Sequence, residues 1–189
     1  MYTKNIIKYI LVCIIMLSSK YVAGFEEGAQ LPEIEISAKG KIILKDGKVQ
    51  YVPWSSREIC GEKPVVFYYM PAKISSDGAF TLLNDEIALR GLSAPHNYVS
   101  VTIVNVDQAV WGTSRLAYAA VEKNKKDNPN DEIVVDERGD AMSKWNIDLS
   151  AVALIIMDGS GRLSYFHAGW PLQSDVEEIA DKLENLISD

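Results

Sequence analysis

The chain has 189 residues and a formal net charge of −7 at pH 7. That length is sufficient for one domain of ordinary size after removal of a targeting segment. A chain this acidic offers no basic surface to nucleic acid or to anionic lipid, so neither is expected as a partner.

The first 24 residues have the pattern of a secretory signal peptide. Lys4 and Lys8 give a positive start, residues 9–17 form a short apolar run, and small residues at 22–24 mark a cleavage site. The apolar run is too short for a stable membrane span, although an uncleaved N-terminal anchor is the alternative interpretation. The sequence therefore predicts a periplasmic protein with a single mature domain over 25–189. Removing the three lysines of the first 24 residues takes the formal charge from −7 to −10.

The first half of this domain alternates short apolar runs with turn signals. An Asp-Gly pair at Asp46 and Gly47, between two apolar runs, is typical of a β-hairpin. Lys39 and Gly40 are expected to form an earlier turn. A later run of Val, Phe and Tyr without polar alternation predicts a central strand that is covered on both faces. The expected elements are strands over 33–37, 41–44, 49–52 and 65–69, a helical turn over 55–60, and a helix that Ser76 or Asp77 caps and that ends near Arg90.

The second half continues with helices between apolar strands. Residues 98–106 are expected to form another buried strand, and residues 151–157 a third. A turn at 158–161 then pairs the third strand antiparallel with the run that follows it. Ser174 with Glu177 has the spacing of a capping box, which begins an amphipathic C-terminal helix. The remaining expected elements are a helix from Arg115 to about Lys126, a strand over 132–136, a brief helix over 140–145 and a strand over 162–167.

This order of elements predicts an α/β fold. Alternating strands and helices with a terminal antiparallel pair describe a mixed central sheet flanked by helices, preceded here by an N-terminal β-hairpin. The order is similar to that of thioredoxin-like proteins, in the branches of the periplasmic thiol reductases and the peroxiredoxins. In that fold, the strand that matches 65–69 and the helix after it carry the redox dithiol Cys-x-x-Cys.

A closer resemblance rests on four segments and on their order. They are TIVNVD at 102–107, EKNKK at 122–126, IVVD at 133–136 and SAVALIIMDGSG at 150–161. Through these segments the mature chain resembles the YtfJ family, small secreted bacterial proteins with a thioredoxin-like fold. The similarity covers the mature chain and is strongest in its later part. It implies a periplasmic thioredoxin-like domain without an established reaction.

The position of the redox dithiol holds no cysteine in this chain. Residues 72–76 read Ala-Lys-Ile-Ser-Ser, so Ser75 and Ser76 replace sulfur, and a hydroxyl caps a helix but does not carry electrons. The cis-proline of redox thioredoxins is also missing, because the matching position is Val152 and no proline lies between 139 and 169. A cis bond before a residue other than proline costs about 2.5–4 kcal/mol, so a trans bond is expected there. Dithiol oxidoreductase activity is therefore not expected.

Cys60 is the one cysteine that remains after signal cleavage, and it supports an alternative function as a single-cysteine thiol redox protein or peroxidase. It precedes the central strand, whereas the redox position follows that strand. Glu58 and Glu62 flank Cys60 and are expected to disfavour the reactive thiolate. A hydrolase that uses Ser75 or Ser76 is a third alternative, but the chain has no Gly-x-Ser-x-Gly motif.

The main functional hypothesis is a binding or accessory module that uses the groove of this fold without redox chemistry. Lys73, near the expected start of a helix, adds to an electrostatic field that favours an anionic group. The expected partner is an unidentified periplasmic protein or small ligand, and no cofactor is expected. No metal is expected either, because His96 and His167 lack the spacing of metal ligands. The candidate residues of the groove are Pro71, Lys73, Ser75, Ser76, Asp107, Trp111, Ala151 and Val152.

Overall fold

A seven-stranded sheet forms the centre of the computed structural model, which describes residues 25–59, 61–73, 76, 78–107, 114–148 and 151–188. The predicted signal peptide lies outside the described residues. The strands are β1 (Glu35–Lys45), β2 (Lys48–Ser55), β3 (Val65–Pro71), β4 (Val99–Asn105), β5 (Glu132–Asp136), β6 (Ala153–Met157) and β7 (Leu163–Ala168). The helices are η1 (Ser56–Ile59, a 3-10 turn), α2 (Thr81–Leu89), α3 (Ser114–Asp127), α4 (Asp140–Lys144) and α5 (Gln173–Ser188).

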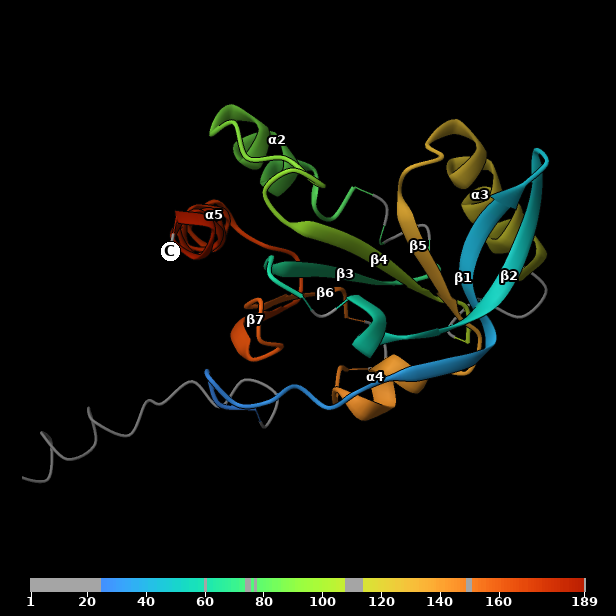
Figure 1. Ribbon diagram of the computed structural model, residues 1–189, viewed down its shortest axis with the longest axis horizontal. Helices are drawn as coiled ribbons and strands as arrows, with labels where there is room; N and C mark the ends of the chain where they lie inside the picture. Colours follow the sequence, from blue (N-terminus) through green and yellow to red (C-terminus); the bar gives the residue numbers. More distant parts are fainter. Residues whose placement is uncertain are drawn as a thin grey trace, which may run out of the picture.

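The order of the strands across the sheet is β2-β1-β5-β4-β3-β6-β7 (Figure 1). Strands β3, β4 and β5 are mutually parallel, and the other neighbours pair antiparallel. Strand β4 is therefore the middle strand of the sheet, with three strands on each side. The predicted mixed sheet with an N-terminal hairpin is confirmed.

Helices cover both faces of the sheet, but unequally. Figure 1 shows α2, α5 and α3 on one face, and α4 with the N-terminal segment on the other. The alternating side chains of β3 pack accordingly: Tyr68 contacts Phe80, with ring centroids 5.1 Å apart, and Phe67 contacts Trp145, with centroids 4.9 Å apart. Both faces of β3 are therefore buried in apolar clusters, as the continuous apolar run predicts.

The hairpin between β1 and β2 has the predicted turn. Asp46 and Gly47 both have positive φ, 52° and 71°, as a type I′ turn requires. The expected turn at Lys39 and Gly40 is wrong, because β1 continues through these residues as a bulge in the pairing with β2. A Cβ atom at Gly40 would lie 2.3 Å from the Val52 carbonyl oxygen, so the bulge requires glycine.

The helices agree with expectation in position and differ at their starts. Helix α2 begins only at Thr81 and has no side-chain cap there, so the predicted capping by Ser76 is wrong. Asp77, the other predicted cap, lies outside the described residues. Gly78 precedes this helix with a φ of +77°, a conformation that interrupts a right-handed helix. The capping box of Ser174 is also wrong, because α5 begins before Ser174 and the Asp175 carboxylate accepts the N–H of Leu172 at 2.7 Å.

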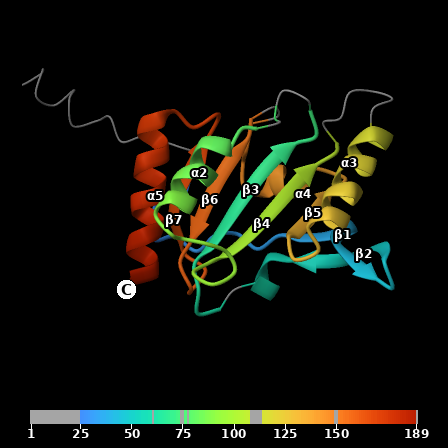
Figure 2. The same cartoon turned by 90° about the horizontal axis from the view of Figure 1, so that it is seen from above.

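Strand β4 differs from the prediction of a strand that is buried on both faces. Val101 and Ile103 are fully buried on the face of α4, whereas Ser100 and Thr102 are only half-buried on the opposite face. Figure 2 shows the cause: on this face, α2 and α5 lie over the half of the sheet that contains β6 and β7, and α3 lies over the half that contains β5 and β1. Among the described residues, no helix therefore covers β4 on this face. The connections from β3 to β4 and from β4 to β5 both move toward the β2 edge of the sheet. Because both connections have the same handedness, their helices, α2 and α3, lie on the same face.

Candidate functional site

The parallel strands end together at one edge of the sheet, which is here called the carboxyl edge. The register pairs Pro71 of β3 with Asn105 of β4, and Asn105 with Asp136 of β5. In open α/β sheets, ligands commonly bind beside the carboxyl ends of the strands. This edge is also where sequence reasoning places the groove.

A buried polar cluster stands behind the carboxyl edge. The Asn105 side chain is fully buried, donates to the Tyr69 hydroxyl at 2.6 Å, and accepts the Asp107 N–H at 2.9 Å. The Asp136 carboxylate is also fully buried and accepts the N–H groups of Asp140 and Ala141 at 2.9 and 2.8 Å. These bonds connect β3, β4, β5 and the first turn of α4.

The electrostatics of this cluster follow from its burial. Burial raises the pKa of the Asp136 carboxyl, and hydrogen bonds from the backbone of Ala141, Asp140 and Arg138 offset part of that rise. Burial likewise raises the pKa of the Tyr69 phenol. Sequence reasoning missed Tyr69 and Asn105, although an asparagine at the end of the apolar run 98–106 was a usable signal. The hydrogen bond from the Asp107 N–H to Asn105 fixes the backbone at Asp107, whose side chain is exposed.

Most of the described groove candidates lie at this edge. Pro71 is buried at the end of β3, and Lys73 is half-buried two residues later. Val152 is buried, and Ala151 is half-buried directly before it. They reach the same edge because β6 runs antiparallel to β3, with Ala153 opposite Tyr69. The structure thus brings Pro71, Asp107, Ala151 and Val152 to one edge, and Ser75 and Trp111 lie outside the described residues.

The segment after Lys73, where the sequence predicts the start of a helix, is described only in part, because residues 74, 75 and 77 lie outside the described residues. The N–H of Ser76 donates to the carbonyl of Lys73 at 3.0 Å, and Ser76 is 5% exposed. Helix α2 starts only at Thr81. The anion site that the sequence predicts beside Lys73 therefore stays a prediction.

Cys60 lies outside the described residues, but the residues on both sides of it are described. Ile59 packs against the core, and the Gly61 carbonyl lies close to Gly159 in the turn between β6 and β7. That turn is at the end of β3 opposite the carboxyl edge. Seven strand residues at about 3.3 Å each separate the two ends by roughly 20 Å.

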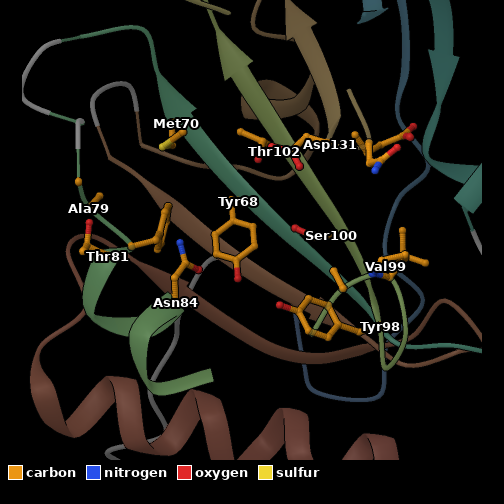
Figure 3. A pocket seen from close by; sticks show the side chains of 16 residues that line it. Tyr68, Met70, Ala79, Thr81, Asn84, Tyr98, Val99, Ser100, Thr102 and Asp131 are labelled. Atoms are coloured by element: carbon orange, nitrogen blue, oxygen red, sulfur yellow. The ribbon is translucent and has the colours of Figure 1, made fainter. Parts of the chain in front are cut away.

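A cleft of about 690 Å³ lies over β4 and is here called the central cleft. Its floor is the half-open face of β4, and its walls come from α2 and from the loops before β4 and β5. Figure 3 shows these side chains around the cleft. It is lined by Tyr68, Met70, Gly78, Ala79, Phe80, Thr81, Asn84, Ala94, Pro95, Tyr98, Val99, Ser100, Thr102, Asn130, Asp131 and Glu132.

Two buried tyrosines form the base of the central cleft. The hydroxyls of Tyr68 and Tyr98 point toward one another in Figure 3 and are hydrogen-bonded. Burial raises the pKa of both phenols; their shared bond raises the pKa of Tyr68 further and partly offsets the rise for Tyr98. The two hydroxyls are therefore partners of one another at the base of the cleft.

The charges of the central cleft lie at one end. Of its two acidic residues, Glu132 forms an ion pair with Lys41 at 2.6 Å, and Asp131 is exposed. Lys125 is 6% exposed and donates to the backbone carbonyls of Pro129 and Asp131. No lysine, arginine or histidine is among the lining residues that the structure describes.

The described residues offer neither a metal cluster nor a helix that could span a membrane. Within the described ranges, no group of three or more His, Cys, Asp or Glu residues is placed to hold a metal ion. Across those ranges, none of the helices has the length and the apolar character that a bilayer crossing requires.

The strand order, the helices and the carboxyl edge define a thioredoxin-like α/β domain. Solved structures share this fold at low sequence identity. A chain from Chlorobium tepidum described as a thiol:disulfide interchange protein DsbE gives a TM-score of 0.57 at 13% identity, over 86% of this chain and 99% of that chain. The reduced 2-Cys peroxiredoxin of Plasmodium vivax gives a TM-score of 0.55 at 15% identity, over 86% and 96%.

The sequence assigns the family. Residues 25–186 match the family described as "Bacterial protein of unknown function (YtfJ_HI0045)", and the chain belongs to it. The uncharacterized protein YtfJ of Escherichia coli (strain K12) is 27% identical over 178 residues, which cover 94% of this chain and 95% of that protein. An uncharacterized protein of Haemophilus influenzae is 25% identical, over 93% and 95%. The predicted family resemblance is confirmed.

Proposed function

We propose that this protein is a periplasmic module that binds a small ligand and does not carry out dithiol exchange. The observation that carries the proposal is the central cleft. The middle strand of the sheet keeps one face open, and polar side chains line it where apolar ones would ordinarily be buried. Its volume of about 690 Å³ falls within the range of roughly 300–1,000 Å³ that small-molecule sites occupy.

The chemistry of the carboxyl edge supports the second half of the proposal. Dithiol exchange needs two thiols within bonding distance, and residues 72–76 contain none. The two cysteines of the chain are Cys13, in the predicted signal peptide, and Cys60. The neighbours of Cys60 lie at the opposite end of β3 from the redox position of this fold.

The predicted compartment has its support in the sequence alone. Residues 1–24 have the charge and hydropathy pattern of a secretory signal peptide. Loss of this segment makes the remaining chain more acidic, which argues against nucleic acid as the partner. Fusion of residues 1–24 to a reporter enzyme that is active only after export tests this part of the proposal, and a reporter that stays inactive contradicts it.

The binding function is tested by amide-resolved NMR of the purified protein with mixtures of small metabolites. We expect chemical-shift changes confined to β4, α2 and the loop before β5. Ser100→Phe fills the central cleft and should abolish these changes. Ser143→Phe places the same ring on the exposed opposite face, on α4, and should retain them. Changes that survive Ser100→Phe contradict the assignment of the cleft.

The redox alternative is tested separately with the Cys60→Ser variant. Insulin reduction and peroxide consumption, each in the presence of dithiothreitol, should be the same for the protein, the variant and buffer. A rate above buffer that requires Cys60 would support the single-cysteine redox protein and contradict the proposal.

A further inference from the structure

We infer that the central cleft binds a neutral polyhydroxyl compound of the size of a mono- or disaccharide. This inference rests on the proposed function and adds the chemical class of the ligand. Its basis is the kind of hydrogen-bonding group that the cleft presents, together with the charges that it lacks.

Hydroxyl and amide groups with no protein partner converge on the cleft. Ser100 and Thr102 occupy alternate positions of β4, so both side chains point to the same face, as Figure 3 shows. Asn84 extends toward them from α2 (Figure 3). Within the described residues, none of these three side chains forms a hydrogen bond to the protein. The Tyr68 and Tyr98 hydroxyls, which are hydrogen-bonded to one another, lie at the base of the cleft.

These groups match the hydrogen-bonding pattern of sugar hydroxyls. A serine or threonine hydroxyl donates one hydrogen bond and accepts others, and an asparagine amide does both with separate atoms. A sugar hydroxyl has the same dual character, so each contact can form in either direction. A ligand with acceptors only would leave part of this lining without partners, which is costly in a desolvated site.

The side-chain charges of the cleft argue against charged ligands. Phosphate and carboxylate groups are bound by Arg, Lys or helix N-termini. No basic side chain is among the described lining residues, and the start of α2, which borders the cleft without a side-chain cap, is the one described feature there that favours an anion. The carboxylate of Glu132 is already paired with Lys41, and Asp131 is exposed to solvent, where a single charge attracts a cation weakly. The cleft therefore favours a ligand without net charge.

Apolar surface beside the polar floor fits the carbon skeleton of a sugar ring. Met70 is half-buried at one end of the cleft, and Pro95 is exposed at its wall. Sites for small ligands generally combine such apolar walls with a few convergent polar groups. A wholly apolar ligand would instead desolvate Ser100, Thr102 and Asn84 without replacing their bonds to water.

The test is a set of NMR titrations of the purified protein with three panels. The first contains glucose, galactose, maltose and trehalose, the second glucose 6-phosphate and gluconate, and the third glucosamine and putrescine. We expect saturable shifts of the Ser100, Thr102 and Asn84 amides with a member of the first panel, and at least tenfold weaker binding in the other two. Tighter binding of an anion or an amine overturns the inference and leaves the proposed function standing. Absence of any shift with all three panels at 50 mM overturns both.

A matched pair of variants connects the binding to the named groups. The double variant Ser100→Ala with Thr102→Val removes two hydroxyls and should weaken sugar binding by roughly tenfold or more. Ser143→Ala removes a hydroxyl from the exposed opposite face and should leave the affinity unchanged. Amide spectra of both variants without ligand report whether the fold is intact. Equal affinity of the double variant and the wild type overturns the inference.

Discussion

Replacement of Asn105 by leucine should destabilise the protein strongly, because Asn105 connects three elements at the carboxyl edge. Its fully buried side chain donates to the Tyr69 hydroxyl and accepts the Asp107 N–H. Leucine is similar in size but leaves both of these groups without their partner. A buried polar group without a partner costs about 1–3 kcal/mol, so the free energy of unfolding should fall by about 2–4 kcal/mol.

The expected loss corresponds to a decrease in melting temperature of about 5–15 °C for a domain of this size. Urea unfolding followed by circular dichroism measures the free energy directly, provided that the transition is two-state. Asn128→Leu is the control. Asn128 is exposed, its side chain bonds only Asn124 within the described residues, and its replacement should cost no more than about 0.5 kcal/mol.

A double-mutant cycle with Tyr69→Phe isolates the bond between the two side chains. If that bond is formed, Asn105→Leu with Tyr69→Phe should cost about 1 kcal/mol less than the sum of the single variants, since no hydroxyl is left unpaired. A cost below about 1 kcal/mol for Asn105→Leu, or strict additivity in the cycle, would refute the reasoning that this cluster fixes the carboxyl edge.

Three further predictions concern positions away from the cleft. Gly40→Ala should lower the melting temperature by at least twice as much as Gly47→Ala. Both glycines have positive φ, but only at Gly40 would an added Cβ atom lie within 3 Å of backbone atoms. Equal decreases in melting temperature for the two variants would contradict the bulge at Gly40. Burial opposes the ionisation of Asp158, but hydrogen bonds from Arg162 and Ser160 outweigh it and lower the pKa of Asp158. The ionised carboxylate therefore stabilises the fold at pH values above 3.8, the ordinary pKa of this group. Asp158→Asn should therefore lower the free energy of unfolding at pH 7, and urea unfolding should show the difference shrinking as the pH falls through the lowered pKa. Lys39 lies 4.7 and 5.1 Å from the ring centroids of Tyr51 and Tyr118, so Lys39→Gln should cost about 0.5–1 kcal/mol in urea, whereas exposed Lys48→Gln should cost nothing measurable.

Elements with a local signal were predictable from the sequence. The Asp46-Gly47 turn needs only two residues with positive φ between apolar runs, and the structure has that turn. The C-terminal helix was equally clear, because Val176, Ile179 and Leu183 recur at helical spacing and are buried in the structure. In both places the residues themselves determine the conformation, whichever elements pack around them.

Elements that depend on distant partners were misjudged. A glycine with positive φ is compatible with a turn or with a bulge, and at Gly40 the pairing of β1 with both β2 and β5 decides for the bulge. Similarly, Ser76 resembles a helix cap in sequence. In the structure, the N–H of Ala72 instead donates to the Asn105 carbonyl, which extends the pairing of β3 with β4 and delays α2. The side chain of Asn105 was overlooked because its partner, Tyr69, is 36 residues away.

The sequence of β4 contains a pattern that indicates the open face of the central cleft. Strand β4 has the sequence VSVTIVN, in which Ser100 and Thr102 alternate with apolar residues. Such alternation is typical of a strand with one solvated face, and it conflicts with the prediction of a fully buried strand. The position of β4 in the middle of the sheet became known only from the strand order.

Ser100 and Thr102 should then reduce the stability of the fold in exchange for binding. Their hydroxyls bond nothing in the described protein, and valine has a higher preference for strands than serine. Replacing both by valine should keep or raise the melting temperature, by up to about 4 °C, while sugar binding is lost. Differential scanning calorimetry and NMR titration of the same sample measure the two effects. A decrease of several degrees would instead mean that these hydroxyls stabilise the fold. In that case the polar floor of the cleft would no longer be an argument for a ligand.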